Sequence, residues 1–299
     1  MSLELVKDKI YNHVKDIGHQ QSLDLLGQLS SGKMLRSKLV LKIAGVSEET
    51  VNICAIIEMI QSASLLHDDV IDEADTRRGQ PSINALFDNK TSIMFGDVLY
   101  SKAFTQLTLL NKDIAYNISN SVTLLSVGEM IDVSLAEEFN TSLDLYLDMI
   151  YKKTASLIEA SARVAAIVAS KDEEKFALYG RNLGIAFQMI DDILDITQTS
   201  QQLGKPAMLD FVEGKVTIPY LLLHDRLSTD DKEYLKSLFK KVLDENQTLW
   251  IKEKMNSTNA IKDAIKMANS YASEAIAAIK DENSDDLIDI ISAMVNRDY

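Results

Sequence analysis

Apolar residues recur at intervals of three and four along almost the whole chain, and this spacing constrains its fold more than any other feature. The isoleucines between residues 53 and 60 show the pattern, which gathers side chains on one face of an α-helix. The alternation of apolar and polar residues that marks a strand is absent. The chain contains three prolines, none of them inside a long periodic segment: Pro81, Pro206 and Pro219. The sequence therefore predicts an all-α protein.

We expect helices over residues 3–17, 20–30, 34–45, 48–73, 91–111, 113–138, 142–169, 172–198, 215–227, 231–246, 249–280 and 284–296. Two loops, at residues 72–82 and 198–215, follow helices that end in acidic residues. Both contain charged residues together with glycine and proline, a composition that favours loops over a bound ligand. The chain has no evident linker or internal repeat, so we expect one domain over residues 1–299.

Charge and cysteine content narrow the class of protein. The chain has 299 residues and a net charge of −14, and without a basic tail it is a poor candidate for binding nucleic acid. Its single cysteine, Cys54, lies in an apolar segment, which excludes a disulfide framework and fits the reducing cytoplasm. Residues 1–20 have the pattern of an amphipathic helix rather than a signal peptide, and no apolar run reaches the length of a membrane span. We therefore expect a cytoplasmic protein without a membrane span.

Two segments place three aspartates at the end of an apolar helix. Residues 68–72 and 191–195 both have the pattern Asp-Asp-x-x-Asp. On a helix the three carboxylates fall on one side, where each like-charged pair costs about 0.2–0.5 kcal/mol in water and more near a core. One such cluster is commonly a solvated acidic face, but two copies favour a cation between them. Ligands that are all oxygen favour Mg²⁺, which binds one or two carboxylates together with substrate phosphates.

Basic residues on predicted loops follow both acidic segments: Arg77 and Arg78 after the first, Lys205 and Lys215 after the second. Lys33 and Arg36 lie at a predicted helix start, where free N–H groups favour anions. Lys153 and Thr154 interrupt another helical segment. Ordinary surface ion pairing is the alternative for each residue alone. Because the order of charges repeats, we favour a substrate with several phosphates, held between Mg²⁺ and basic side chains.

These segments resemble the trans-type (all-E) isoprenyl diphosphate synthases, and among them the polyprenyl (heptaprenyl- and octaprenyl-like) diphosphate synthases. Residues 68–79 are similar to the first aspartate-rich motif of that family, and residues 187–195 are similar to the second. Shorter elements match in the same order: Gly32-Lys33 with Arg36, Gly96-Asp97, Lys153-Thr154-Ala155, Gly204-Lys205-Pro206, and Gly214-Lys215 with Thr217 and Pro219. The resemblance extends from about residue 30 to about residue 220 and implies one bundle of roughly 10–13 helices around a central cavity, the isoprenoid synthase fold.

The resemblance implies that two diphosphate substrates meet at these residues. Mg²⁺ would be held by Asp68, Asp72 and Asp191, with weaker or indirect contributions from Asp69, Asp192 and Asp195. The allylic diphosphate would lie against Arg77, Lys153, Thr154, Gln188, Lys205 and Lys215. Isopentenyl diphosphate would lie against Gly32, Lys33, Arg36, Gln61 and Arg78. The expected catalytic residues are Asp68, Asp72, Asp191, Lys153 and Arg77, which would assist ionisation of the allylic substrate before the isopentenyl double bond attacks.

Three positions depart from the pattern of the family. Histidine is common where this chain has Gln61, arginine where it has Met34, and proline where it has Ser37. Glutamine can still donate to a phosphate oxygen but carries no charge. These differences affect the expected isopentenyl diphosphate pocket and leave both aspartate clusters unchanged.

Ala63 and Ser64 lie one helical turn before Asp68, and both are small. In the family, bulky aromatic residues at these positions accompany short products, because the growing tail extends past them. The resemblance therefore implies a medium-to-long all-trans product for quinone side chains, built on farnesyl or geranylgeranyl diphosphate. Helix packing alone would also explain two small residues.

Other readings of the sequence remain open. A farnesyl or geranylgeranyl diphosphate synthase would make shorter products with the same motifs. A terpene cyclase would lack the Lys33 and Arg36 element, and a non-catalytic subunit of a heteromeric synthase would be expected to lose aspartates or arginines that this chain keeps. The resemblance also implies a homodimer and, because the product is a lipid, a peripheral membrane contact during product release.

Overall fold

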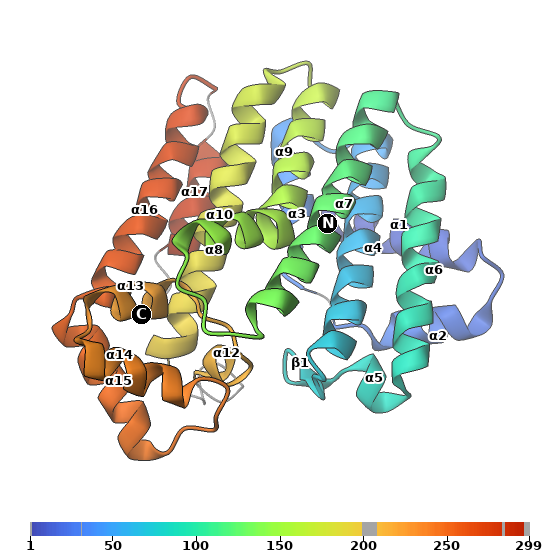
Figure 1. Cartoon of the computed structure of the whole chain (residues 1–299). Helices are drawn as coiled ribbons and strands as arrows, with labels where there is room; N and C mark the ends of the chain where they lie inside the picture. The colour runs from blue at the N-terminus through green and yellow to red at the C-terminus, as the bar shows by residue number, and fades with distance from the viewer. Residues whose placement is uncertain (1, 31, 199–207, 283–284, 296–299) are drawn as a thin grey trace. The chain divides into compact units, whose positions relative to one another are not determined.

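The computed structural model describes residues 2–30, 32–198, 208–282 and 285–295, and most of them are helical (Figure 1). The α-helices are α1 (Ser2–Lys15), α2 (Gln20–Gln28), α3 (Leu35–Ala44), α4 (Glu48–Ile71), α5 (Ile83–Leu86), α6 (Asn89–Leu107), α7 (Lys112–Leu135), α8 (Leu143–Ile150), α9 (Ser156–Val168), α10 (Glu173–Thr197), α12 (Leu209–Val212), α13 (Ile218–Arg226), α14 (Thr229–Leu238), α15 (Glu245–Ser257), α16 (Ala260–Ala278) and α17 (Asp285–Val295). A π-helix, η1 (Tyr151–Ala155), joins α8 to α9. The all-α expectation is confirmed.

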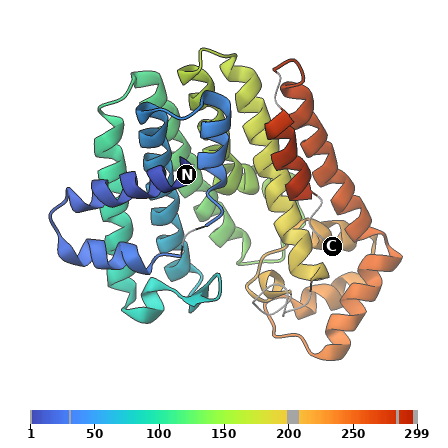
Figure 2. The ribbon, with the colours of Figure 1, turned by 180° about the vertical axis from the view of Figure 1, so that it is seen from behind.

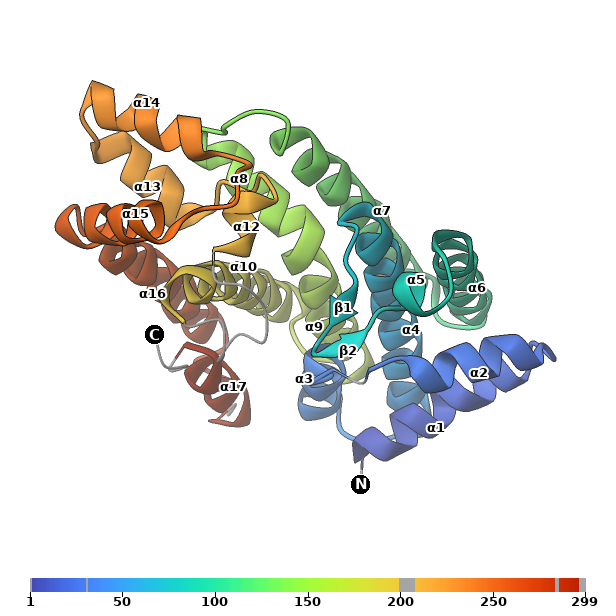
Figure 3. The same cartoon turned by 90° about the horizontal axis from the view of Figure 1, so that it is seen from below.

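Two very short strands form an antiparallel hairpin that the sequence did not predict (Figure 3). Strand β1 (Thr76–Arg77) pairs with β2 (Gln80–Pro81). Arg78 and Gly79 form the turn with φ of 54° and 73°, the pair of positive values that a two-residue hairpin favours. Strands of two residues are too short to show alternation, so the expected loop at residues 72–82 contains them without a sequence signal.

The chain divides into two compact units, which we describe separately. Unit 1 contains residues 1–122 and 159–177, and unit 2 contains residues 123–158 and 178–299. The divisions fall inside helices α7, α9 and α10. A single domain over residues 1–299 stays a prediction.

Helix α4 is the central element of unit 1. It begins at a capping box in which Ser47 Oγ accepts the N–H of Thr50 at 3.1 Å and Thr50 Oγ1 accepts the N–H of Ser47 at 2.8 Å. Its apolar residues are buried almost all round, because α1, α3 and α6 pack against it (Figure 1). The motif that ends α4 is therefore carried on a well-supported helix.

In the described part of the chain, α4 alone is long and apolar enough to cross a membrane. We expected no apolar segment as long as a membrane span. Judged by length and composition alone, that expectation is wrong for α4. However, 67% of the apolar window is buried inside the protein, as it is in any core helix, so the finding is weak support for a membrane span.

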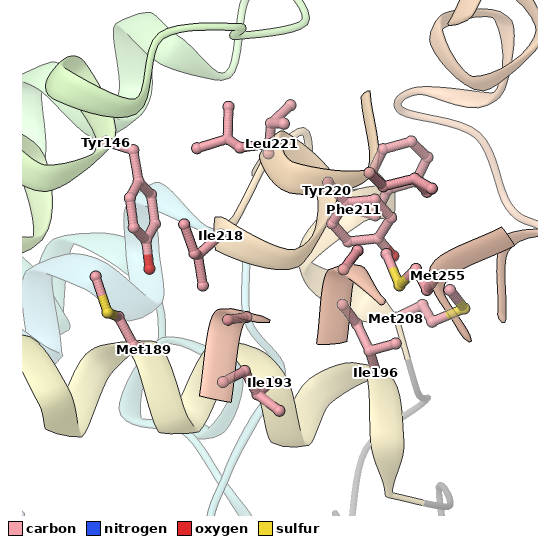
Figure 4. Packing of buried hydrophobic residues seen from close by; sticks show 14 of the residues in the cluster. Tyr146, Met189, Ile193, Ile196, Met208, Phe211, Ile218, Tyr220, Leu221 and Met255 are labelled. Carbon is pink, nitrogen blue, oxygen red and sulfur yellow. The ribbon is translucent and has the colours of Figure 1, made fainter. Parts of the chain in front are cut away.

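The core of unit 2 gathers side chains from α8, α10, α12, α13, α15 and α16 (Figure 4). Phe211 and Tyr220 stack with ring centroids 4.3 Å apart at the centre of this cluster. Alanines at every fourth position of α16 are completely buried and allow α13 to pack closely: Ala260, Ala264 and Ala268. Tyr179 of α10 donates a hydrogen bond to the carbonyl of Leu287 in α17 at 3.0 Å. Figure 2 shows the ribbons of α10 in yellow and α17 in dark red side by side.

Helix boundaries near the C-terminal end differ from those expected. The single helix expected over residues 249–280 is divided into α15 and α16 at Asn259, whose φ is 57°. Asparagine tolerates this left-handed conformation better than most residues. The helix expected over residues 231–246 is shorter and ends at Leu238.

Candidate active site

The first aspartate cluster lies at the C-terminal end of α4. Asp68 and Asp69 occupy its last turn, and Asp72 caps it with an N–H donated to the carbonyl of Asp68 at 2.8 Å. The C-terminal end of a helix carries partial negative charge, which disfavours carboxylates there. Three acidic residues at this position therefore raise the free energy of the folded protein, and a bound cation would offset that cost.

Asp69 is buried and forms an ion pair with Arg77. Its side chain accepts a hydrogen bond from Nε of Arg77 at 2.6 Å, and the residue is only 4% exposed. Burial raises the pKa of Asp69, and the charge and hydrogen bond of Arg77 oppose that rise. Asp69 thus fixes the hairpin arginine, whereas Asp68 and Asp72 are half-buried.

The residues expected to bind isopentenyl diphosphate are partly brought together in unit 1. The guanidinium of Arg78 lies directly on Gly32, where an added Cβ would be 2.7 Å from Nη2. Nη1 of Arg78 also donates to the carbonyl of Ser30 at 3.0 Å. Lys33 is exposed nearby in sequence, at the start of the segment that enters α3.

Glu58 of α4 is a member of this cluster that the sequence reading missed. It accepts hydrogen bonds from Oγ of Ser37 at 2.7 Å and from the N–H of Ser37 at 3.3 Å. Burial lowers the pKa of Arg36 to about 10, and the Glu58 carboxylate opposes that change. Burial also lowers the pKa of Arg78, with Arg77 adding to the effect and Glu58 opposing it. Glu58 therefore lies close enough to both arginines to stabilise their charge.

Gln61 follows Glu58 by one helical turn. Its Oε1 is buried and has no hydrogen-bond partner among the described residues. A buried amide oxygen without a partner costs free energy, so this group would accept a hydrogen bond from a donor such as a water molecule. The expected contact with isopentenyl diphosphate would instead use the Nε2 donor and stays a prediction.

The second aspartate cluster lies on α10 in unit 2. Asp192 and Asp195 are 4% and 2% exposed, and Asp191 is half-buried. Tyr146 donates to Oδ2 of Asp192 at 2.6 Å, and Nε2 of Gln188 donates to Oδ1 at 2.9 Å. Figure 4 shows Tyr146 among the core side chains above α10. Both oxygens of Asp192 are thus held by neutral donors from inside the protein.

The electrostatic environment of Asp192 is strongly perturbed. The pKa of Asp192 is raised to about 8, chiefly by burial and also by the charges of Asp210 and Asp191, while the hydrogen bonds from Tyr146 and Gln188 oppose the rise. Gln188 in turn accepts a hydrogen bond from Thr154 at 2.8 Å. Thr154, Gln188 and Asp192 therefore form one hydrogen-bonded chain. The expected contact of Thr154 and Gln188 with the allylic diphosphate and of Asp192 with the metal stays a prediction.

Asp195 binds the segment that begins at Met208, through both its side chain and its backbone. Its Oδ2 accepts the N–H of Asp210 at 3.3 Å, and its carbonyl accepts the N–H of Met208 at 2.9 Å. Lys215 donates its own N–H to the carbonyl of Asp210 at 2.7 Å and pairs with Glu213 at 3.0 Å. Lys205 lies outside the described residues.

Lys153 and Thr154 lie in the π-helix η1, which confirms that they interrupt the helix. Such π-turns occur often at functional sites. Two glycines allow neighbouring helices to pack closely on η1. An added Cβ on Gly128 of α7 would be 2.7 Å from Cα of Lys153. An added Cβ on Gly184 of α10 would be 2.5 Å from Cα of Ala155. Nζ of Lys153 lies 2.8 Å from a carboxylate oxygen of Glu129 and 2.6 Å from one of Asp132.

Sequence reasoning missed Glu129 and Asp132. The signal that could have found them is an acidic pair three residues apart inside an otherwise apolar helix, which is the feature that drew attention to both aspartate clusters.

The donor set fits a metal that takes part of its coordination from substrate. Among the residues described, no group of three or more His, Cys, Asp or Glu side chains converges as a preformed metal cage. Asp68 and Asp72 nevertheless offer carboxylate oxygens one helical turn apart on α4. Mg²⁺ commonly binds through one or two carboxylates and completes its shell with water and phosphate.

The structure therefore forms two partial sites. Unit 1 contains Asp68, Asp69, Asp72 and Arg77 together with Gly32, Lys33, Arg36, Gln61 and Arg78, and unit 2 contains Lys153, Thr154, Gln188, Asp191, Asp192, Asp195 and Lys215. That both act on one pair of substrates stays a prediction. Ala63 and Ser64 are buried on α4, at 0% and 4% exposure.

The described residues are mostly helical, and two of the helices end in aspartate clusters. This combination is typical of helical proteins that bind diphosphates through a divalent cation. A family model described as polyprenyl synthetase matches residues 23–255, and the chain belongs to this family. The resemblance seen in the motifs is confirmed.

Named relatives support the same family. The mitochondrial solanesyl-diphosphate synthase 1 of Oryza sativa is 37% identical over 261 residues, which is 82% of this chain and 60% of the rice protein. The chain thus spans less than two thirds of that relative. The octaprenyl pyrophosphate synthase of Helicobacter pylori is 43% identical with a TM-score of 0.94 over 99% of both chains. The polyprenyl synthase of Caulobacter crescentus, solved with calcium and isoprenyl diphosphate, is 28% identical with a TM-score of 0.88, over 99% of this chain and 94% of its own.

Proposed function

We propose that the chain is a polyprenyl diphosphate synthase that condenses isopentenyl diphosphate with an allylic diphosphate. The observation that carries the proposal is the pair of aspartate clusters at defined helix positions, each accompanied by basic or hydrogen-bonding residues that suit a diphosphate. The Caulobacter relative, with its calcium and isoprenyl diphosphate, supports a divalent cation and such a ligand in this family.

Asp68, Asp72 and Asp191 would hold Mg²⁺, which supplies positive charge to the leaving diphosphate when bound. The same diphosphate would bind Arg77, Lys153, Thr154, Gln188, Lys205 and Lys215. Hydrogen-bond donors from these residues would stabilise the negative charge that develops on it. Gly32, Lys33, Arg36, Gln61 and Arg78 would hold the diphosphate of the second substrate.

The proposed reaction at these residues is a substitution that releases diphosphate and one proton. The allylic C–O bond breaks and leaves diphosphate, and the isopentenyl double bond attacks the resulting carbon to form a new C–C bond. A proton then leaves the extended chain, and the departed diphosphate accepts it. The helical site needs no nucleophilic side chain for this sequence.

A medium-to-long all-trans product, built on farnesyl or geranylgeranyl diphosphate for a quinone side chain, agrees with the names of the octaprenyl and solanesyl relatives. The small, buried Ala63 and Ser64 support it further. A shorter product remains the alternative, and the measured chain length decides between them. A non-catalytic subunit is disfavoured because the acidic and basic residues of both partial sites are present.

We also propose a cytoplasmic homodimer that touches the membrane surface when it releases its product. Exposed apolar side chains on α6 of unit 1, among them Ile93 at 40% and Met94 at 59% exposure, support a subunit contact. Sedimentation of the purified protein tests the dimer, and flotation with lipid vesicles tests the membrane contact.

The metal-dependent reaction is tested with purified protein, isopentenyl diphosphate and farnesyl diphosphate. We expect prenyl transfer that requires Mg²⁺ and stops in excess EDTA. Asp68→Ala and Asp191→Ala should each lower turnover by several orders of magnitude without lowering the unfolding temperature, since each removes a like charge from its cluster. Asp225→Ala, at an exposed aspartate of α13, should leave turnover unchanged. Full activity in EDTA would contradict the metal assignment.

A further inference from the structure

The ammonium group of Lys153 lies between two buried carboxylates of α7. Nζ is 2.6 Å from Oδ2 of Asp132 and 2.8 Å from Oε2 of Glu129. Asp132 and Glu129 are 7% and 8% exposed. The three side chains all belong to unit 2 and together carry a formal charge of −1.

Fold stability alone does not account for this arrangement. Two carboxylates three residues apart on a helix repel each other, and ionised groups lose hydration when they are buried. Replacing such a buried ionic group by apolar side chains is often neutral or stabilising. A buried ionic group that costs folding free energy suits a role other than stability. Here that role would be to hold the ammonium group of Lys153 in place.

The backbone around Lys153 is fixed by the same turn of α7. A Cβ on Gly128 would overlap the backbone of Lys153, so glycine is required for the contact between α7 and η1. Gly128, Glu129 and Asp132 therefore set both the backbone position and the side-chain direction of Lys153. The neighbouring Lys152 shows the ordinary case, since it pairs with Asp148 at 2.6 Å on the same helical segment, where the Asp148 side chain is 44% exposed.

We propose that Glu129 and Asp132 are positioning residues that hold the Lys153 ammonium ready for the leaving diphosphate. The proposal rests on the proposed function. A lysine side chain has many rotamers, and ordering it during the reaction would add to the barrier. The two carboxylates order it beforehand, so that its charge is already in place when negative charge develops on the diphosphate.

A double-mutant experiment with the full chain tests this directly. Asp132→Asn and Glu129→Gln remove one charge each and keep the shape of the side chain. We expect each to lower kcat by about ten- to a hundredfold, the loss typical of a displaced catalytic group, while the KM for isopentenyl diphosphate stays unchanged. In the Lys153→Ala background, Asp132→Asn should cause no further loss, because the residues act as a unit.

Asp148→Asn is the matched control and should retain wild-type kcat. Thermal unfolding of every variant shows whether it is folded, and Glu129→Gln is read in the same way if Asp132→Asn fails to fold. The proposal is overturned if Asp132→Asn lowers kcat by the same factor with and without Lys153, or if its main effect is on the KM for isopentenyl diphosphate. Absence of prenyl transfer by the wild-type protein would instead reject the proposed function.

Discussion

Gly32 gives the guanidinium of Arg78 room to lie against the backbone. An added Cβ would meet the far end of this flexible side chain at 2.7 Å, so the side chain can move aside at little cost to stability. We predict that Gly32→Ala raises the KM for isopentenyl diphosphate by up to about tenfold, the lower range for losing one charged phosphate contact. Steady-state kinetics with both substrates check this. An equal rise in the KM for the allylic substrate would contradict the placement of Arg78.

His13 makes the folded protein sensitive to mild acid. Burial lowers the pKa of His13, although its hydrogen bond with Asn52 at 2.7 Å opposes the change. Unfolding restores a pKa near about 6.5, so below that pH the unfolded chain binds a proton that the folded chain binds less readily. The contribution of His13 to the free energy of unfolding is present above about pH 6.5. It is lost as the pH falls toward the lower pKa that His13 has in the folded protein.

His13→Gln keeps a hydrogen-bonding side chain but cannot titrate in this range. We predict that its free energy of unfolding declines less than that of the wild type between about pH 7.5 and pH 5.5. Urea denaturation at several pH values measures the difference. Parallel curves for the two proteins would show that His13 does not contribute.

At the residue scale, the sequence predicted the groups that stand in motifs but not their partners. Glu58 was missed because it contacts Ser37, and Asp132 because it contacts Lys153, and each contact joins residues 21 positions apart. In both contacts the two residues belong to different elements, so the periodicity within one helix does not show which residue is the partner. The resemblance already implied a weaker or indirect role for Asp69, but its ion pair with Arg77 was not expected, since it depends on how the hairpin returns Arg77 to the end of α4.

At the element scale, the packing of η1 depends on glycine from α10. A Cβ on Gly184 would lie 2.5 Å from Cα of Ala155, and a backbone cannot move aside as a long side chain can. We predict that Gly184→Ala destabilises the fold by about 1–2 kcal/mol, because overpacking of about 1–3 kcal/mol exceeds the gain of up to about 1 kcal/mol in helix propensity. Chemical denaturation measures this change.

Gly27→Ala in α2 is the control for that substitution. A Cβ there has no neighbour within 4 Å, so only the gain in helix propensity remains and the variant should be slightly more stable than the wild type. If Gly184→Ala is also more stable, the close approach of α10 to η1 is wrong.

The helical class and the positions of the long helices followed from periodicity, whereas helix number and helix ends did not. Twelve helical spans were expected, and the described residues form sixteen α-helices and one π-helix. The long helices α4, α7 and α10 agree with the expected spans within a few residues. The expected helix over residues 249–280 failed because its apolar spacing continues through Asn259, where only the backbone conformation changes. The two-residue strands lie in the loop expected over residues 72–82, α12 lies in the loop expected over residues 198–215, and α5 lies between the first loop and the helix expected from residue 91. None of them was predicted, because elements of two to four residues show no period.

Product length is a property of the whole molecule, since it depends on every side chain that the growing tail meets. Ser64 and Ala63 are buried one turn before Asp68, and a ring at either position has to displace its surroundings at a cost of about 1–3 kcal/mol. We predict that Ser64→Phe and Ala63→Tyr retain metal-dependent activity. The product should shorten to about three or four isoprene units, because each further unit added to the tail would meet that steric cost. Chromatography of the dephosphorylated products measures their length.

Thermal unfolding of both variants serves as the control, because a destabilised protein would make less product rather than shorter product. Unchanged length with activity retained would mean that the tail does not run along this face of α4. The sequence indicated that these residues are small, but the space beyond them depends on contacts between distant segments, which no single stretch of sequence specifies.

The pairing of Arg77 with Asp69 has a consequence for turnover. Because Asp69 holds Nε of Arg77 at 2.6 Å, the arginine keeps this carboxylate partner whether or not a diphosphate lies against its other N–H groups. In the proposed reaction, pyrophosphate would leave after each condensation. An arginine with its own resident anion would then release that by-product without losing all of its counter-charge.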